Sequence, residues 1–131
     1  MARNKFQKGV TLIANHTEMK GDVIFKDQFF VAGKISGNIQ AEGDKATLIV
    51  SEEGFVSGEI RVPNVVISGT IEGNVYASHK VELSNQSKVK GSIYYKLIEM
   101  QLGALVDGQL VHDENLGTQP NVHPLKTDIG E

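Results

Sequence analysis

The residues Ile35-Ser36-Gly37-Asn38-Ile39 form a phrase, apolar-x-Gly-x-apolar, that decides the fold because it returns along the whole chain. Ile71-Glu72-Gly73-Asn74-Val75 repeats it closely, and four further copies occupy residues 19–23, 56–60, 89–93 and 106–110. Six copies in one short chain indicate an internal repeat, and such a repeat dictates the architecture before any single element is considered.

The spacing of the repeat excludes units that contain helices. The central glycines stand at 21, 37, 58, 73, 91 and 108, so the successive intervals are 16, 21, 15, 18 and 17 residues. Ankyrin and tetratricopeptide repeats need roughly 33 to 34 residues for their helix pairs. Each unit of this chain therefore has room for strands and turns only.

Within each unit apolar residues alternate with polar ones, as at Val65, Ile67, Ile71, Val75 and Ala77. A period of two is typical of a strand with one face buried and one face in water. The turn before the glycine phrase places its flanking apolar residues either four or six positions apart. A difference of two keeps the inward stripe inward, whereas a difference of one would turn a strand inside out.

A strand with a single apolar face that turns and resumes after about 17 residues can bury that face by coiling and stacking on its own next turn. We therefore predict an all-β, right-handed parallel β-helix of about six coils. A left-handed hexapeptide β-helix is the alternative, and the variable coil length disfavours it. The predicted organisation is a flexible basic tail at 1–10, the β-helix at 11–111 and a disordered tail at 112–131.

Composition narrows the function classes. The 131 residues carry a net charge of −3 and no cysteine, which disfavours nucleic-acid binding and excludes disulfides and thiolate metal sites. No G-x-x-x-x-G-K-[ST] loop is present, so we expect no nucleotide. His16, His79, His112 and His123 are scattered, so we expect no metal and no other cofactor. The N-terminus lacks a long apolar run, which favours the cytoplasm.

The glycine phrase, together with the segment Leu97-Ile98-Glu99-Met100-Gln101-Leu102-Gly103-Ala104-Leu105-Val106-Asp107-Gly108, resembles the bactofilins, polymer-forming cytoskeletal proteins of bacteria. The resemblance covers roughly residues 10 to 111. It implies a right-handed β-helix flanked by flexible tails, assembly without nucleotide into filaments that lack polarity, and recruitment of cell-wall enzymes to the inner membrane. It departs from the family at Val106, where many members carry an aromatic residue.

The physical route to a filament is the pair of β-helix ends. Edge strands have unpaired N–H and C=O groups that pair with another chain unless a cap covers them, and the sequence contains no recognisable cap. If like ends meet, each contact is symmetric and the filament has no direction. The predicted polymerisation interface comprises apolar residues near both ends: Leu12, Ile13, Met19, Val23, Leu102, Leu105, Val106 and Leu110.

Further expectations concern the membrane and partners. The cations Arg3, Lys5 and Lys8, with Phe6, suggest a weak contact with the inner membrane. The expected partners are other copies of the chain and, from the resemblance, peptidoglycan-modifying enzymes or membrane proteins. We expect no enzymatic activity. The alternatives are a non-polymeric β-helix adaptor and a β-helix carbohydrate-active or acyl-transferring enzyme, for which no column of outward carboxylates or histidines is seen.

Overall fold

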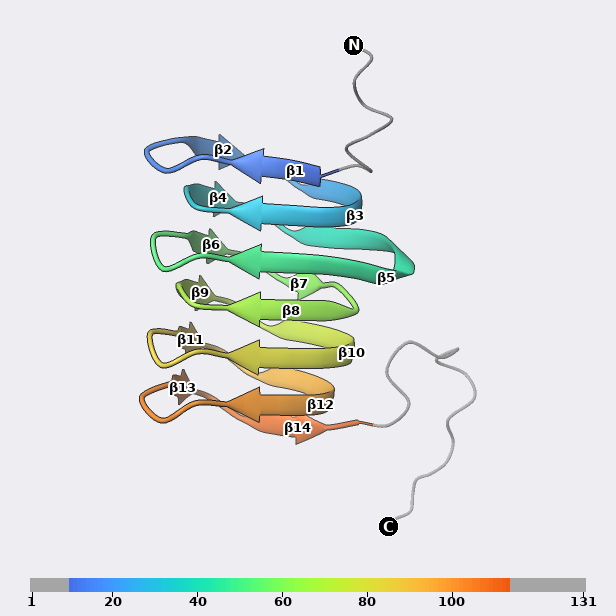
Figure 1. Ribbon diagram of the computed structural model, residues 1–131, viewed down its shortest axis with the longest axis vertical. Helices are drawn as coiled ribbons and strands as arrows, with labels where there is room; N and C mark the ends of the chain where they lie inside the picture. Colours follow the sequence, from blue (N-terminus) through green and yellow to red (C-terminus); the bar gives the residue numbers. More distant parts are fainter. Residues whose placement is uncertain (1–9, 114–131) are drawn as a thin grey trace.

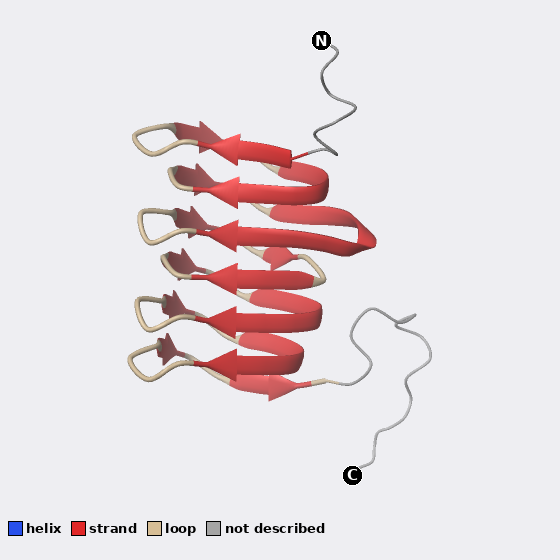
Figure 2. Ribbon diagram, viewed as in Figure 1, coloured by secondary structure: helices blue, strands red, loops and turns tan. Residues whose placement is uncertain are grey.

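The computed structural model describes residues 10–113, which form strands and connecting turns without any helix (Figure 2). In this part of the chain there is accordingly no helix that could cross a membrane. The strands are β1 (Val10–Ile13), β2 (Glu18–Lys20), β3 (Val23–Val31), β4 (Lys34–Ser36), β5 (Ile39–Val50), β6 (Phe55–Ser57), β7 (Ile60–Arg61), β8 (Asn64–Ile67), β9 (Thr70–Glu72), β10 (Val75–Leu83), β11 (Lys88–Lys90), β12 (Ile93–Met100), β13 (Leu105–Asp107) and β14 (Leu110–His112).

The strands stack into two parallel sheets that run the length of a rod. One sheet has the order β1-β3-β5-β7-β10-β12-β14, with β8 between β5 and β10, and the other has the order β2-β4-β6-β9-β11-β13. In Figure 1 each coil crosses the front from right to left, returns behind from left to right and steps toward the C-terminal end, which is a right-handed path. The predicted right-handed parallel β-helix of about six coils is confirmed.

The rod has three faces. The front face in Figure 1 contains β1, β8 and the second halves of β3, β5, β10 and β12. The six-stranded sheet forms the second face. The third face contains β7, β14 and the first halves of β3, β5, β10 and β12. Register shifts inside β3 and β10 mark the corner between the third and front faces.

Inward-pointing residues at equivalent positions of successive coils stack on one another. On the second face, Met19, Ile35, Val56, Ile71, Val89 and Val106 form one such column. Ile35, Val56 and Ile71 are fully buried, while the first and last members are only partly covered. Burying a side chain of this size contributes about 1.5–3 kcal/mol, so the interior columns supply most of the driving force for folding.

Glycine forms the corner between the second and third faces. At Gly58 the backbone has φ of +148°, and a Cβ would lie 2.0 Å from the carbonyl oxygen of Gly37 in the coil above. Only glycine permits both the positive φ and this close approach. The neighbouring Asn38 side chain accepts a hydrogen bond from the Glu59 N–H at 3.0 Å, which satisfies a backbone donor at the same corner.

The corner between the front and second faces comes in two sizes, as predicted from the two turn lengths. Turns at 14–17, 51–54, 84–87 and 101–104 protrude, and the two-residue turns at 32–33 and 68–69 are recessed (Figure 1). On the opposite corner β5 extends beyond its neighbours, because residues 43–46 stand where the coil above has only Asp27. This insertion accounts for the long 21-residue interval in the repeat.

The last strand runs slightly beyond the β-helix domain predicted from the sequence. β14 runs to His112, the first residue that the sequence assigns to the C-terminal tail, because His112 pairs with Tyr95 in the coil above. The rest of the two predicted tails lies outside the described residues, except for Val10 and Asp113.

Candidate assembly surfaces

The two ends of the rod are the candidate functional surfaces. Among the strands of residues 10–113, β1, β2 and the first half of β3 at the N-terminal end have a neighbouring strand on one side only. At the C-terminal end the same is true of β13, β14 and the second half of β12. Each edge strand therefore directs a row of backbone N–H and C=O groups away from the rod, which is a template for adding another strand.

The N-terminal end surface is formed by the uppermost inward residues of the three faces. Register places Ile13 above Val31, Met19 above Ile35 and Val23 above Ile39, and all three lower residues are fully buried or nearly so. Ile13, Met19 and Val23 are themselves only partly buried and pack on the core from above. Together with Thr11 and Phe25, they give this end an apolar centre.

The C-terminal end surface follows the same rule. Its inward residues lie beneath the side chains of the coil above, and none of these five is fully buried: Ile98, Met100, Ala104, Val106 and Leu110. His112 completes the set, with its ring centroid 5.6 Å from that of Tyr95. Met100 is 44% exposed and Leu110 is 43% exposed, so both have apolar surface still to bury.

The structure divides the eight predicted interface residues into two groups. Ile13, Met19, Val23, Val106 and Leu110 belong to the end surfaces. The other three point away from the core: Leu12 lies above the outward Phe30, Leu105 lies beneath the outward Lys88, and Leu102 is in a turn with 96% of its surface exposed. These three are at the ends of the rod but on its outer surface.

Several end-surface residues were not predicted from the sequence, among them Ile98 and Met100. A signal for them existed, because Ile98 stands 17 residues after Val81, and Met100 stands 17 residues after Leu83. Both pairs are in register in the structure. Matching positions from coil to coil would have found them, whereas a search for apolar character alone finds Leu102 first.

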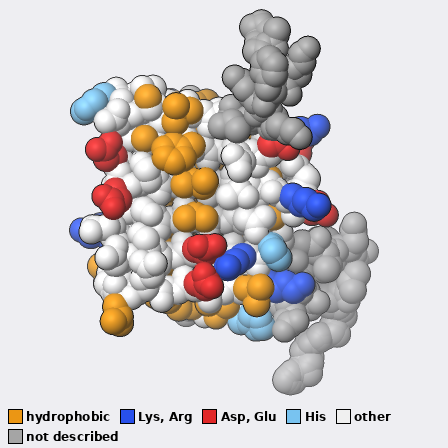
Figure 3. Space-filling model, in the orientation of Figure 1, with side chains coloured by type: hydrophobic (Ala, Val, Ile, Leu, Met, Phe, Trp, Pro, Cys, Tyr) orange, Lys and Arg blue, Asp and Glu red, His pale blue; other side chains and the backbone are white. Residues whose placement is uncertain are grey.

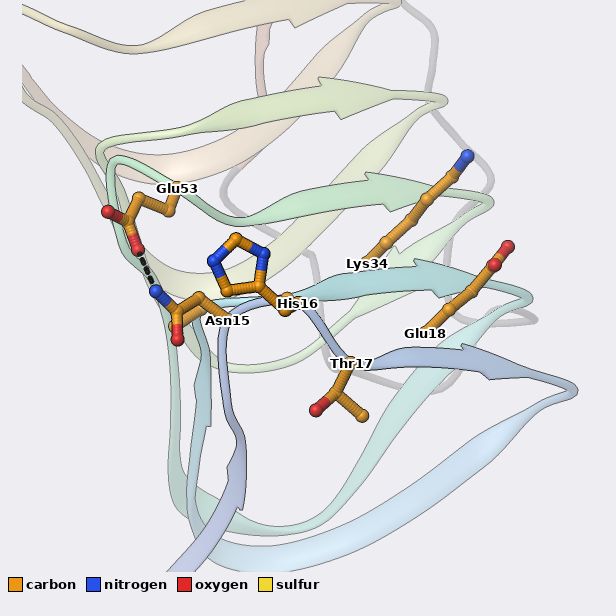
Figure 4. A pocket seen from close by; sticks show the side chains of 8 residues that line it. Asn15, His16, Thr17, Glu18, Lys34 and Glu53 are labelled. Carbon is orange, nitrogen blue, oxygen red and sulfur yellow. Dashed lines mark hydrogen bonds between the residues drawn. The ribbon is translucent and has the colours of Figure 1, made fainter.

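A notch lies on the corner between the front and second faces, near the N-terminal end (Figure 4). It lies over the recessed turn at 32–33, between the protruding turns at 14–17 and 51–54. The Asn15 amide donates a hydrogen bond to Glu53 at 2.9 Å across the notch and so ties the first coil to the third. Its other charged lining residues, Glu18 and Lys34, are exposed, and no cluster of three metal ligands occurs within residues 10–113.

Comparison with known proteins identifies the family. The family model described as bactofilin, polymer-forming cytoskeletal, matches residues 11–111. The chain belongs to the bactofilin family. The resemblance seen in the sequence is confirmed.

Two relatives of this bactofilin come from Myxococcus xanthus (strain DK1622). Bactofilin BacO is 31% identical over 113 residues, which cover 82% of this chain and 87% of BacO. Bactofilin BacP is 26% identical over 115 residues, which cover 87% of this chain and 47% of BacP, so the match spans about half of BacP. No solved structure matches the chain significantly.

Proposed function

We propose that this bactofilin assembles end to end, without nucleotide, into non-polar filaments that scaffold cell-shape or cell-wall enzymes at the cytoplasmic face of the inner membrane. The observation that carries the proposal is the pair of open sheet edges, each surrounding an apolar centre. An added copy would cover Met19 or Val106 as Ile35 and Val89 are covered inside the rod. In this role the protein is structural and not catalytic, in keeping with a cytoskeletal family.

The charges of β2 favour contacts between like ends. An antiparallel pair of β2 strands centred on Met19 keeps inward residues inward and sets Glu18 of each copy opposite Lys20 of the other, which gives two opposite-charge pairs. Stacking the C-terminal end of one copy on the N-terminal end of the next sets Asp107 near Lys20 and Leu105 near Glu18, which gives one pair. Contact between two N-terminal ends therefore has one more opposite-charge pair than a head-to-tail contact, whereas contact between two C-terminal ends sets Leu105 opposite Asp107 and has none. Symmetric contacts at both ends produce a filament without direction.

The membrane part of the proposal involves Arg3, Lys5, Phe6 and Lys8, which lie outside the described residues. Each basic residue near an anionic surface contributes about 1 kcal/mol, so one copy binds weakly. A filament presents many copies at once and binds by avidity. Replacing the three cations with alanine is expected to abolish co-sedimentation of filaments with anionic vesicles while leaving filament formation unchanged.

End-to-end assembly is tested by a matched pair of arginine substitutions in β13. Val106→Arg places a charge in the centre of the C-terminal end surface, where burial without a partner costs several kcal/mol. Leu105→Arg, one residue earlier on the same strand, points outward and is the control. Negative-stain microscopy should show filaments for the wild type and Leu105→Arg, and only monomers or dimers for Val106→Arg. Filaments of Val106→Arg with unchanged length would contradict the proposal.

Polarity is tested with cysteines, because the chain has none. Single cysteines at Glu18, Met19 and Lys20, and separately at Leu105, Val106 and Asp107, are oxidised within filaments. A like-to-like contact brings the two copies of its central residue, Met19 or Val106, within the 4.4–6.8 Å Cα separation of a disulfide and holds the copies of each flanking residue farther apart, so the Met19→Cys and Val106→Cys variants should give dimers. A polar filament would instead need one cysteine at each end and would give long cross-linked ladders.

A further inference from the structure

The front face carries an apolar stripe on its outer surface, away from the core. Leu12, Phe30, Ile49 and Val66 follow one another in register through coils one to four. Figure 3 shows a vertical row of hydrophobic side chains on the front face. Leu12 is 60% exposed and the other three are partly exposed. Because the strands that carry them already bury their inward side chains, the fold gives no reason for this row to be apolar.

The stripe ends where the charges begin. The next two positions in the same register are Glu82 and Glu99, and Lys80 lies 3.5 Å from both carboxylates. Above them, the second outward row of the front face is polar but uncharged, with Gln28, Thr47 and Asn64. Across coils two to four, the outward strand residues of the front face thus carry no charge.

The other two faces differ from the front face in this respect. In the same coils the second face presents Lys34 and Glu72 outward, and the third face presents Lys26, Glu42 and Arg61. A partner protein of opposite charge would be recognised better on either of those faces. A partner with the same charges is approached most easily through the uncharged face, and depletion of charge with an aromatic side chain is typical of an interface centre.

We propose that the stripe of Leu12, Phe30, Ile49 and Val66 binds the same stripe of a second copy, and that it thereby pairs neighbouring filaments side by side. This inference rests on the proposed end-to-end assembly. The stripe also starts at an end surface, since Leu12 lies in the edge strand β1.

The size of the front face explains why filaments pair and single molecules do not. Six coils about 4.8 Å apart and strands about 13 Å long give the face a footprint of roughly 380 Å². A stable interface buries about 800 Å² on each partner, so two monomers would separate readily. A filament repeats the stripe along its length, and each further contact becomes intramolecular once the first has formed. Lateral pairing should therefore appear only after polymerisation.

The test compares two glutamate substitutions in the same strand, β3. Phe30→Glu places a charge in the stripe, while Ile24→Glu replaces an apolar residue on the third face that is 64% exposed. Low-speed centrifugation collects bundles, and high-speed centrifugation collects all filaments. Wild type and Ile24→Glu should pellet at low speed and show paired filaments by microscopy. Phe30→Glu should lose most of its low-speed pellet, keep its high-speed pellet and show single filaments.

A milder variant and a lipid control complete the design. Ile49→Thr keeps a β-branched side chain, so it folds normally and should also lose low-speed material. The pairing proposal alone would be overturned by wild-type filaments that stay single at every concentration, or by bundles of Phe30→Glu filaments. If the wild type failed to pellet at high speed, both the pairing proposal and end-to-end assembly would be overturned. Filaments that bind phosphatidylcholine vesicles through Phe30 would overturn it by assigning the stripe to a lipid surface.

Discussion

Two glycine-to-alanine substitutions separate the contributions of conformation and contact at the glycine corner. Gly58 and Gly21 occupy equivalent corners and both have positive φ, +148° and +122°. At Gly58 a Cβ would lie 2.0 Å from the Gly37 carbonyl oxygen, whereas at Gly21 it would meet nothing within 4 Å. The reason is topological, because Gly21 follows the edge strand β2 and has no coil above it.

The expected magnitudes follow from these two environments. A non-glycine residue held at such φ costs about 1–3 kcal/mol, and both variants incur this cost. At Gly58 the coils must also move apart by more than about 1 Å to reach an ordinary contact distance. That movement weakens the hydrogen bonds from the Gly37 N–H to the Ser57 carbonyl and from the Ile39 N–H to the Glu59 carbonyl, now 2.9 and 2.8 Å. At about 1 kcal/mol for each bond, the extra cost is about 2 kcal/mol.

The measurement is urea unfolding followed by far-ultraviolet circular dichroism. Both variants are made in a Val106→Arg background and measured at a protein concentration at which that background is monomeric, so that assembly does not stabilise the folded state. Gly58→Ala should lower the free energy of unfolding by about 3–5 kcal/mol and Gly21→Ala by about 1–3 kcal/mol. Equal losses would refute the contact argument and leave backbone conformation as the only requirement. With the native Val106, Gly21→Ala should impair filament formation, because its methyl group projects from the N-terminal end surface.

Two further substitutions test how the coils are held together. Tyr76→Ala removes a ring that stacks on Tyr94, with centroids 4.7 Å apart and 5° between planes, and that the Arg61 guanidinium covers at 4.1 Å. Thermal unfolding should therefore show that the free energy of unfolding falls by about 2 kcal/mol, and the near-ultraviolet tyrosine signal should be reduced. Ser87→Ala removes a buried hydroxyl that donates a hydrogen bond to the Ser84 carbonyl at 2.8 Å, and the Ser87 N–H still donates to that carbonyl in the variant. Urea unfolding should therefore show that the free energy of unfolding falls by only about 1 kcal/mol, and a fall of about 3 kcal/mol would contradict this interpretation.

Much of the fold could be predicted because every coil repeats the same pattern of apolar residues and glycine. Ile35, Val56, Ile71 and Val89 each precede a glycine by two residues, and they form one column in the structure. The even difference between the two turn lengths predicted that inward residues stay inward across the turn, and the buried column confirms it. Such repetition supplies the long-range contacts that a single sequence normally hides.

The features that escaped prediction are those that occur once. The corner at Asp27, where a non-glycine residue has φ of +67°, has no counterpart in the repeat. The overhang of β5 depends on an insertion that only the three-dimensional register reveals. The apolar character of Leu12 and its position near the end of the rod predict an end-surface residue. The alternation of inward and outward residues places it on the outer side, because its neighbour Ile13 points inward. Hydrophobicity alone does not distinguish an end surface from an outer stripe.

The register that makes the coils alike also explains why the ends are suited to assembly. Inside the rod, Val56 is fully buried because one coil lies above it and another lies below. Met19 and Val106 occupy the same column but have a neighbouring coil on one side only. An added copy that meets a like end continues the apolar column, and it pairs the edge strands in an antiparallel ladder, where the ladders between adjacent coils are parallel. The free energy of an end contact should then approach that of one coil–coil interface, less the entropy lost on association.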